Sequence, residues 1–255
     1  MTSYEMASVL RRAELTRTAQ KPFSESQSLT LAEGYAVQSA GLALRQEAGE
    51  ILCGYKMGLT SRAKQRDVNV FEPIRGYLLR SYEVLRGEPV RTGGRIHPRV
   101  EPEVALIFKD PVGGKYASVR EVVSSLASVV PACEIIDSRY EAFSFKLGDV
   151  VADNTSASGF MLGSWELKGA LNEVPLLGVT MKKNGQLVET GAPAAVLGDP
   201  LISAVQAVRM LAEEGKRIEA GMVLLTGGIT AAVPFQAGDW IEMIWPGESL
   251  SFRAV

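Results

Sequence analysis

The sequence predicts an α+β fold in which a mixed, strand-rich core carries helices at its N-terminus and on its periphery. Most apolar stretches beyond residue 50 are short or alternate with a period of two, as strands do. Helical periodicity is confined to a few segments, which several strand-like stretches separate. Because helices and strands do not alternate regularly, the pattern favours neither a Rossmann sheet nor a TIM barrel.

The composition is that of a globular protein: 255 residues, 46% hydrophobic and 22% charged. We expect an N-terminal helical part (1–75) and a β-rich core (76–255) that form one compact unit. The net charge is −2, with no basic stripe, so neither nucleic acid nor anionic membrane is an expected partner. No apolar stretch reaches the ~18 residues of a membrane span. Because the N-terminus lacks a signal-peptide pattern, we expect a cytoplasmic protein.

Two helices are predicted near the N-terminus. Residues 3–19 have an amphipathic pattern. Thr30 and Glu33 fit a capping box, which opens a second helix ending near Gly49.

A strand at 51–57 should follow these helices and carry Lys56 close to its end, just before Gly58. A lysine at the end of a buried strand, beside a glycine turn, is well placed to meet an anionic substrate. An exposed lysine is an equally good interpretation of the pattern alone. A short polar helix is expected at 62–67.

The centre of the chain predicts a strand at 99–108 with two acidic side chains on one face. Glu101 and Glu103 alternate with apolar residues, which places their Cα atoms about 7 Å apart on the same side. A third acid, Glu134, lies in the apolar strand 131–136. Three carboxylates near a partly buried region need a counter-charge, and Mg²⁺ or Mn²⁺ would suit them. A solvated outer face is the usual alternative for such spacing.

The histidine and cysteine content limits other kinds of site. His97 is the only histidine, which excludes multi-histidine metal sites, and we expect a structural role for it. Cys53 and Cys133 lie in apolar strand-like stretches, so we expect buried free thiols rather than a disulfide or a nucleophile.

The remaining elements follow from capping, turn and proline signals. A capping box at Ser118 opens a helix that should run to about Val129, where Pro131 stops it. Residues 137–156 are rich in small polar residues and are expected to form a functional loop. Asn184-Gly185 predicts a hairpin turn, and Asp199-Pro200 opens a helix that ends near Glu214. Further strands are expected at 76–84, 88–90, 177–182, 187–189, 223–226, 240–244 and 249–254.

Taken together, several motifs resemble those of one known family. They are Lys56-Met57-Gly58-Leu59-Thr60-Ser61, Pro98-Arg99-Val100-Glu101-Pro102-Glu103, Glu134-Ile135-Ile136-Asp137-Ser138-Arg139-Tyr140, Val151-Ala152-Asp153-Asn154 and Thr226-Gly227-Gly228, in that order. The chain resembles the fumarylacetoacetate hydrolase superfamily, in its hydratase/decarboxylase branch from meta-cleavage degradation of aromatic compounds. This similarity extends from about residue 30 to the C-terminus. It implies a compact β-rich roll with an N-terminal helical part.

Within this branch the resemblance leaves two activities open. One is decarboxylation of 2-oxo-3-hexenedioate (4-oxalocrotonate) to 2-hydroxypenta-2,4-dienoate and CO₂, and the other is hydration of that dienoate. The hydratases carry an acid where this chain has Ile74, and the segments 136–140 and 226–232 look like those of the decarboxylases. We therefore expect the carboxy-lyase. Arg75 departs from the neutral residue usual there, a difference that bears on substrate preference.

The resemblance also implies roles for individual residues. Glu101, Glu103 and Glu134 match the family's metal ligands, with Mg²⁺ or Mn²⁺ as the cofactor. Lys56 and Asp153 are the expected catalytic residues. The expected contacts to a 2-oxo dicarboxylate substrate come from Lys56, Leu59, Asn154, Ser156, Ser158, Thr226, Gly227 and Gly228. Arg139 has two candidate partners, Asp137 and the substrate, and we expect the structural pair with Asp137.

The resemblance further implies assembly. We expect a homo-oligomer and a complex with a sister hydratase. Besides the decarboxylase and the hydratase, a third interpretation is that the chain is a non-catalytic partner subunit. Acylpyruvate hydrolysis is disfavoured because it uses a histidine–glutamate pair in an N-terminal lid, and His97 lies far from such a segment.

Overall fold

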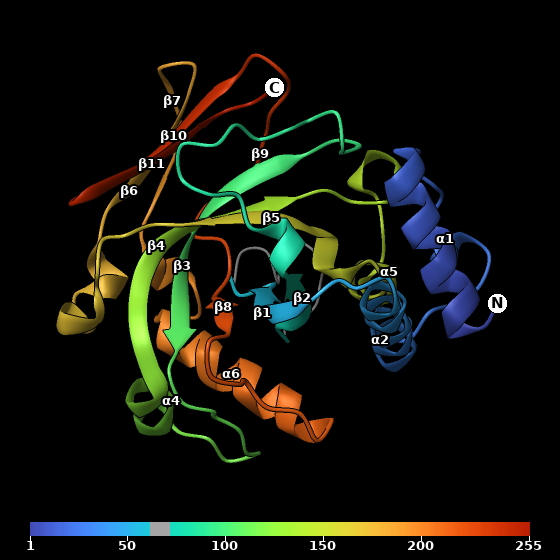
Figure 1. Ribbon diagram of the computed structural model, residues 1–255, viewed down its shortest axis with the longest axis horizontal. Helices are drawn as coiled ribbons and strands as arrows, with labels where there is room; N and C mark the ends of the chain where they lie inside the picture. The colour runs from blue at the N-terminus through green and yellow to red at the C-terminus, as the bar shows by residue number, and fades with distance from the viewer. Residues whose placement is uncertain (62–71) are drawn as a thin grey trace.

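A computed structural model describes residues 1–61 and 72–255, which form two β-sheets with helices around them. The helix expected at 62–67 lies outside the described residues. The larger sheet has the strand order β2-β1-β8-β3-β4-β5, with β9 pairing to β3, and the smaller has the order β11-β10-β6-β7. Figure 1 places the smaller sheet at the upper left, and the N-terminal helices on the opposite side. The α+β expectation is confirmed.

The larger sheet curls into a roll whose two ends approach each other. Its strands are β1 (Leu52–Gly58), β2 (Ile74–Leu79), β3 (Arg99–Phe108), β4 (Leu126–Ile136), β5 (Ala157–Leu162), β8 (Val223–Leu225) and β9 (Val233–Pro234). Just beyond β2, the Val84 N–H donates to the Phe160 carbonyl of β5 over 2.8 Å. Side chains on the inner face therefore converge even when their strands lie far apart in the sheet order.

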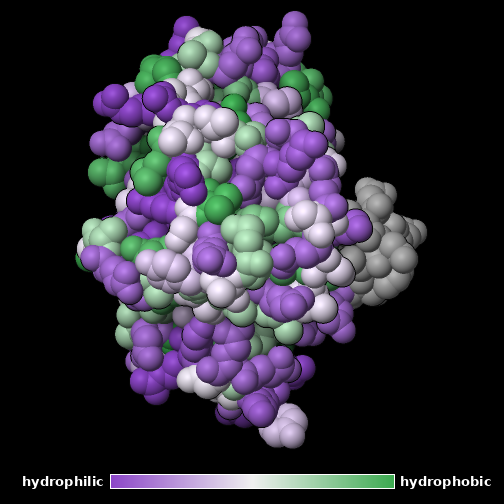
Figure 2. Space-filling view, turned by 90° about the vertical axis from the view of Figure 1, so that its right-hand side faces the viewer, coloured by the Kyte–Doolittle hydropathy of each residue, from purple (hydrophilic) through white to green (hydrophobic). Residues whose placement is uncertain are grey.

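The N-terminal helices cover one side of this roll. They are α1 (Ser3–Thr16) and α2 (Leu31–Glu47), and α5 (Leu147–Ala152) packs beside them. Capping boxes start α1 at Thr2 and α2 at Thr30, the latter as predicted. The outer face of this side is largely hydrophilic, with hydrophobic side chains scattered in small groups (Figure 2). The apolar stripes of the helices thus face inward.

Two more helices and the smaller sheet complete the fold. The capping box at Ser118 opens α4 (Val119–Ser125), which packs against α6 (Pro200–Glu213), the helix that crosses below the roll in Figure 1. The smaller sheet contains β6 (Val179–Lys183), β7 (Gln186–Gly191), β10 (Trp240–Trp245) and β11 (Glu248–Arg253). The predicted hairpin turn is present, because Asn184 and Gly185 both have positive φ, at 53° and 80°.

Two predictions about the middle of the chain are wrong. The helix expected to reach Val129 ends at Ser125, and β4 continues through Pro131. The Pro131 carbonyl accepts a hydrogen bond from the Gly163 N–H, so the backbone nitrogen of Pro131 points to the same side, toward β5. Proline is tolerated there because β5 pairs with β4 only from Ala132 onward, so no ladder hydrogen bond is lost. The expected loop at 137–156 contains α5 and short 3-10 segments.

Other expectations concern boundaries and thiols. The proposed division at residue 75 falls inside β2 and stays a prediction. Cys53 and Cys133 are buried free thiols, as expected, and burial raises their pKa values to about 11 and about 12. Among the described helices, none is both long and apolar enough to cross a membrane.

Candidate metal centre and active site

Three glutamates converge on the inner face of the roll. Glu101 of β3 lies directly opposite Glu134 of β4, and Glu103 is the next residue of β3 on the same face. Their carboxylate oxygens include one from each residue within 4.8 Å of the others. The residues are 5%, 0% and 0% exposed for Glu101, Glu103 and Glu134. The predicted acidic face is therefore confirmed as an interior face, and the solvated alternative is wrong.

The electrostatics of this cluster call for a cation. Burial and the neighbouring carboxylates raise the pKa of Glu103 well above its ordinary value, while burial raises that of Glu134 to about 7. Among the described residues, no hydrogen-bond donor reaches Glu103 Oε1 or Glu134 Oε1. Buried, unpartnered carboxylate oxygens are costly without a counter-ion, and an all-oxygen set suits Mg²⁺ or Mn²⁺. The donor set thus fits the implied metal.

Lys56 reaches the glutamates from β1. Its Nζ lies 2.9 Å from Glu134 Oε2 and donates to the Thr155 carbonyl over 3.2 Å, and the residue is only 3% exposed. The alternative of an exposed lysine is therefore wrong. The curl of the sheet makes this contact possible, since β8 and β3 lie between β1 and β4 in the strand order.

Gly227 holds one of the acids from its backbone. Its N–H donates to Glu103 Oε2 over 2.7 Å, and its φ of 117° is a conformation that other residues rarely adopt. A Cβ at this position would lie 2.0 Å from the Thr60 hydroxyl oxygen. The N–H of Gly227 therefore contacts a metal-ligand candidate, and the role of Gly227 as a substrate contact stays a prediction. The glycine at position 227 was the sequence signal that the backbone lies close to another group here.

Asn154, Thr155 and Ser156 form a left-handed segment beside the site. Their φ values are 51°, 50° and 61°, although none is glycine. Such residues cost roughly 1–2 kcal/mol each, so the surrounding contacts must hold them. The Asn154 amide both accepts from the Tyr77 N–H (2.8 Å) and donates to the Tyr77 carbonyl (3.0 Å), which ties the segment to β2.

The hydroxyl groups of the other residues expected to contact the substrate differ in their hydrogen-bond partners. The Ser158 hydroxyl accepts a hydrogen bond from Arg95 Nε, and Thr226 donates from both its N–H and its hydroxyl to the Val104 carbonyl. Ser156 is buried, and no described residue pairs with its hydroxyl. Leu59 and Gly228 remain predictions as substrate contacts.

Asp153 pairs with Arg139 rather than with the glutamates, and this pair is called the arginine clamp below. Its carboxylate accepts from Arg139 Nε and from the Arg139 N–H, the latter over 3.0 Å. The expected Arg139–Asp137 ion pair is wrong, because the Asp137 carboxylate caps the backbone N–H groups of Ile96 and His97. Burial raises the pKa of Asp153 to about 6, and Arg139 opposes this. The catalytic role of Asp153 remains a prediction, but its contacts assign it a structural partner.

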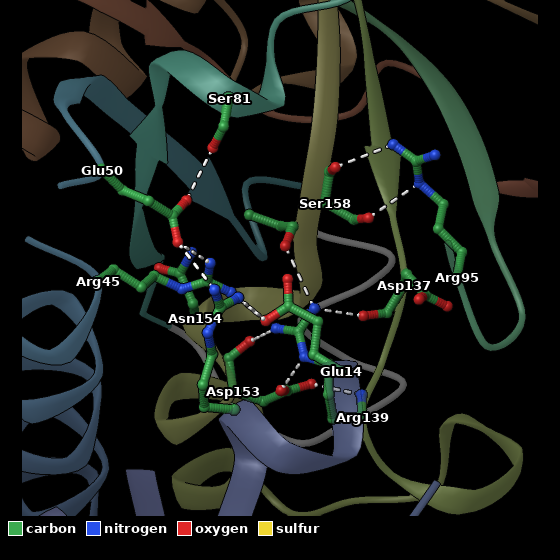
Figure 3. Close-up of polar contacts among 12 residues, drawn as sticks. Glu14, Arg45, Glu50, Ser81, Arg95, Asp137, Arg139, Asp153, Asn154 and Ser158 are labelled. Carbon is green, nitrogen blue, oxygen red and sulfur yellow. Dashed lines mark hydrogen bonds and ion pairs between the residues drawn. The ribbon is translucent and has the colours of Figure 1, made fainter. Parts of the chain in front are cut away.

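The clamp adjoins a cluster of ion pairs between α1, α2 and the roll (Figure 3). Arg45 pairs with Glu14 and, over 2.9 Å, with Glu50, while Arg11 contacts both acids at 3.1 Å. Arg139 adds favourable charge to Glu14. These charges balance, which explains how they remain at the interface between the helices and the roll.

Arg75 points away from the glutamates. In the β1–β2 register Gly76 lies opposite Lys56, so Arg75, the preceding residue, faces the other side. Its guanidinium binds Gln38 Oε1 over 3.1 Å and pairs with Glu214. Its contacts therefore join α2 and the end of α6 to β2.

Comparisons with known proteins identify the family. No family model matches the chain. A 4-oxalocrotonate decarboxylase from Pseudomonas sp. (strain CF600) is 40% identical over 243 residues, which are 95% of this chain and 92% of the relative. A 2-hydroxyhexa-2,4-dienoate hydratase from Comamonas testosteroni is 33% identical over 221 residues, 86% of this chain and 84% of the relative.

Solved structures agree with the sequence relatives. 4-Oxalocrotonate decarboxylase from Pseudomonas putida G7, complexed with magnesium and adipate, superposes with a TM-score of 0.93 at 39% identity, covering 99% of this chain and 97% of that one. A fumarylacetoacetate hydrolase family protein from Yersinia pestis CO92 shares the fold, with a TM-score of 0.62 at 14% identity, covering 80% of this chain and 94% of that one. The chain therefore belongs to the family of the 4-oxalocrotonate decarboxylases and the related dienoate hydratases, and it has the fold of a fumarylacetoacetate hydrolase family protein.

Proposed function

We propose that this protein is a metal-dependent decarboxylase that converts 2-oxo-3-hexenedioate (4-oxalocrotonate) to 2-hydroxypenta-2,4-dienoate and CO₂. The observation that carries the proposal is the convergence of Glu101, Glu103 and Glu134 within 4.8 Å, with Lys56 beside them. No donor from the described residues reaches Glu103 Oε1 or Glu134 Oε1. The similarity to 4-oxalocrotonate decarboxylases, one of them complexed with magnesium and adipate, supplies the substrate class.

The chemistry explains why such a site is needed. In this substrate a double bond lies between the ketone and the carbon that bears the leaving carboxylate. Loss of CO₂ leaves an electron pair that moves through the double bond onto the ketone oxygen, so stabilising that charge lowers the barrier. Mg²⁺ or Mn²⁺, held by the three glutamates, would supply this stabilisation as a Lewis acid.

Lys56 supplies the second cationic group. With its Nζ at Glu134, it can bind a substrate carboxylate or donate a proton to the dienolate oxygen, which gives the 2-hydroxy group of the product. Burial in the roll excludes water from its surroundings, which strengthens both interactions. In this proposal Ser156, whose hydroxyl has no described partner, remains available to the substrate.

The alternative function is hydration of 2-hydroxypenta-2,4-dienoate, a shorter counterpart of the 2-hydroxyhexa-2,4-dienoate after which a hydratase relative is named. Ile74 favours the decarboxylase. It follows the same alternation as Gly76, so it lies on the face of Lys56, where hydratases carry an acid, and it is 3% exposed. A buried isoleucine neither activates nor orders a water molecule.

The decisive assay supplies 2-oxo-3-hexenedioate and Mg²⁺ to the purified protein and measures CO₂ release. The proposal expects stoichiometric CO₂, and no turnover after the metal is removed with a chelator. Addition of water to the dienoate without CO₂ release from the dioate would instead establish the hydratase. Undiminished turnover in metal-free protein would contradict the role of the glutamates.

The role of Lys56 is tested by Lys56→Ala. We expect kcat to fall by roughly 10²–10⁴-fold, as when a proton donor is removed. A change in KM alone would mean that the lysine binds substrate without taking part in the chemistry.

Assembly and location also belong to this proposal. We propose a cytoplasmic homo-oligomer that associates with a sister hydratase, which would consume the dienoate product. The support is membership of a family that contains both activities. Co-purification of the two proteins at defined stoichiometry tests it.

A further inference from the structure

We infer that Arg139 is a positioning residue for the reaction: it fixes the left-handed segment Asn154–Ser156 so that the Thr155 carbonyl holds the Lys56 ammonium in place. The inference rests on the proposed function, because it assigns Lys56 to the chemistry. It gives a role to a buried arginine for which Asp137 was the expected partner.

The first step is the reach of the guanidinium. Arg139 Nη2 donates to the Asp153 carbonyl, and Nη1 donates to the Ala157 carbonyl over 3.2 Å. These two carbonyls immediately precede and follow the left-handed segment, so one planar group connects both of its ends. Nη1 also donates to the Asp137 carbonyl over 2.6 Å, and Nε to the Asp153 carboxylate. A simple ion pair with Asp153 would need only the last of these bonds.

The second step is the orientation of the segment. The Asn154 amide fixes one side of it to the backbone of Tyr77, and Gly76 allows the close approach. A Cβ at Gly76 would lie 2.5 Å from Thr155 Oγ1 and 2.8 Å from the Asn154 carbonyl oxygen. The segment is thus pressed against β2, opposite the position of Lys56 in β1. With both ends held, the direction of the Thr155 carbonyl is determined.

The third step is the contact with the lysine. Thr155 O and Glu134 Oε2 lie 3.2 Å and 2.9 Å from Lys56 Nζ. The carbonyl holds the ammonium from the side of β2, whereas Glu134 attracts it toward the other acids. Because three consecutive non-glycine residues with positive φ are unfavourable, the segment should relax once Arg139 no longer bridges its ends. The ammonium would then lose the contact that opposes its displacement.

The test compares Arg139→Ala with Arg45→Ala. Arg45 is also a buried arginine paired with acids, but its ion pairs go to Glu14 and Glu50. We expect Arg139→Ala to lower kcat on the order of 10²-fold, as misplacement by about 1 Å does, with KM and the Mg²⁺ dissociation constant changed less than about threefold. Arg45→Ala should leave kcat within about threefold of the wild type. Equal loss of kcat in the two variants would overturn the inference.

The coupling to Lys56 is measured in a double-mutant cycle. In the Lys56→Ala background, the same Arg139→Ala change should alter the residual rate by less than about threefold, because its effect acts through the lysine. A reduction of the same factor in both backgrounds would mean a general structural role and would overturn the inference. Where Arg139→Ala does not fold, Arg139→Lys completes the same cycle, since a lysine keeps the charge but cannot bridge the same set of carbonyls.

A readout that does not depend on activity completes the test. A crystal structure of Arg139→Lys should show the Thr155 carbonyl moved out of hydrogen-bond distance of Lys56 Nζ, with Glu101, Glu103 and Glu134 unchanged. A retained contact would overturn the inference. Full activity of Lys56→Ala would instead refute the proposed role of the lysine, and this structural result would still decide whether Arg139 positions Thr155.

Discussion

Two groups of charged residues, one buried and one partly exposed, differ in their charge balance. At the metal centre, three carboxylates gather around Lys56, and two of their oxygens lack a described donor. In the ion-pair cluster between the N-terminal helices and the roll, three arginines interleave with three acids, and each acid has a described arginine partner. The members of this ion-pair cluster are Arg11, Arg45, Arg139, Glu14, Glu50 and Asp153.

The charge balance distinguishes a site that can bind a metal from a structural contact between the helices and the roll. Burying balanced, hydrogen-bonded ion pairs can be nearly neutral in free energy, so the ion-pair cluster can fasten the helices to the roll without any ligand. An excess of buried carboxylates is unfavourable until a cation binds. The excess negative charge therefore lies where a bound metal ion would neutralise it.

The largest expected effect is at the unbalanced site. Glu103→Gln keeps the shape of the side chain but removes its charge, so we expect loss of Mg²⁺ binding and at least a ~10³-fold fall in kcat, with the fold intact. Calorimetry and steady-state kinetics measure the two quantities. Glu166→Gln is the matched control, because that carboxylate binds the backbone N–H groups of Val129 and Lys168 outside the site. Near-normal turnover of Glu103→Gln would show that the charge of Glu103 is not needed for activity.

The opposite pattern is expected in the ion-pair cluster. Arg45→Ala leaves Glu14 and Glu50 without a major partner, which should cost about 3–5 kcal/mol of unfolding free energy. We expect Tm to fall by roughly 10 °C, while kcat of the folded protein is maintained. Arg11→Ala, at the partly exposed edge, should cost no more than about 1 kcal/mol. Comparable losses in the two variants would show that burial does not govern the strength of these pairs.

The smallest effect is a pH dependence of the metal-free protein. The pKa of Glu103 is raised and that of Glu134 is about 7 rather than 4.5, so the folded state holds more protons than the unfolded chain between these values. Their contribution to stability is therefore greatest at low pH and falls as pH rises through about 7, by about 1 kcal/mol per pH unit. Thermal unfolding in chelator at several pH values, for the wild type and Glu103→Gln, measures it. A wild-type pH slope no steeper than that of Glu103→Gln would contradict the assigned cause.

Local patterns predicted much of the fold and the acidic residues of the site. The alternation around Glu101 and Glu103 determined their common face, and the capping boxes at Thr30 and Ser118 started helices where expected. These features depend on residues a few positions apart, whose geometry the backbone repeats fix. An acid inside the apolar strand 131–136 added Glu134 to the set, and the family resemblance supported all three.

Non-local contacts were harder to predict. The extension of β4 through Pro131 depends on where β5 begins to pair, and the partner of Arg139 depends on the position of Asp153. The sequence analysis expected Asp137, two residues away, but the backbone N–H groups of Ile96 and His97 donate to that carboxylate. No short-range rule ranks such competing partners.

By itself, the sequence determined that two glutamates share one face of a strand, because side-chain direction alternates along an extended backbone. Only the tertiary structure decided that this face is the inside of a roll, that Glu134 lies opposite Glu101, and that Lys56 reaches them across the curl of the sheet. The physical reason is that strand register and sheet curvature are properties of the whole set of strands, whereas alternation is a property of each strand alone.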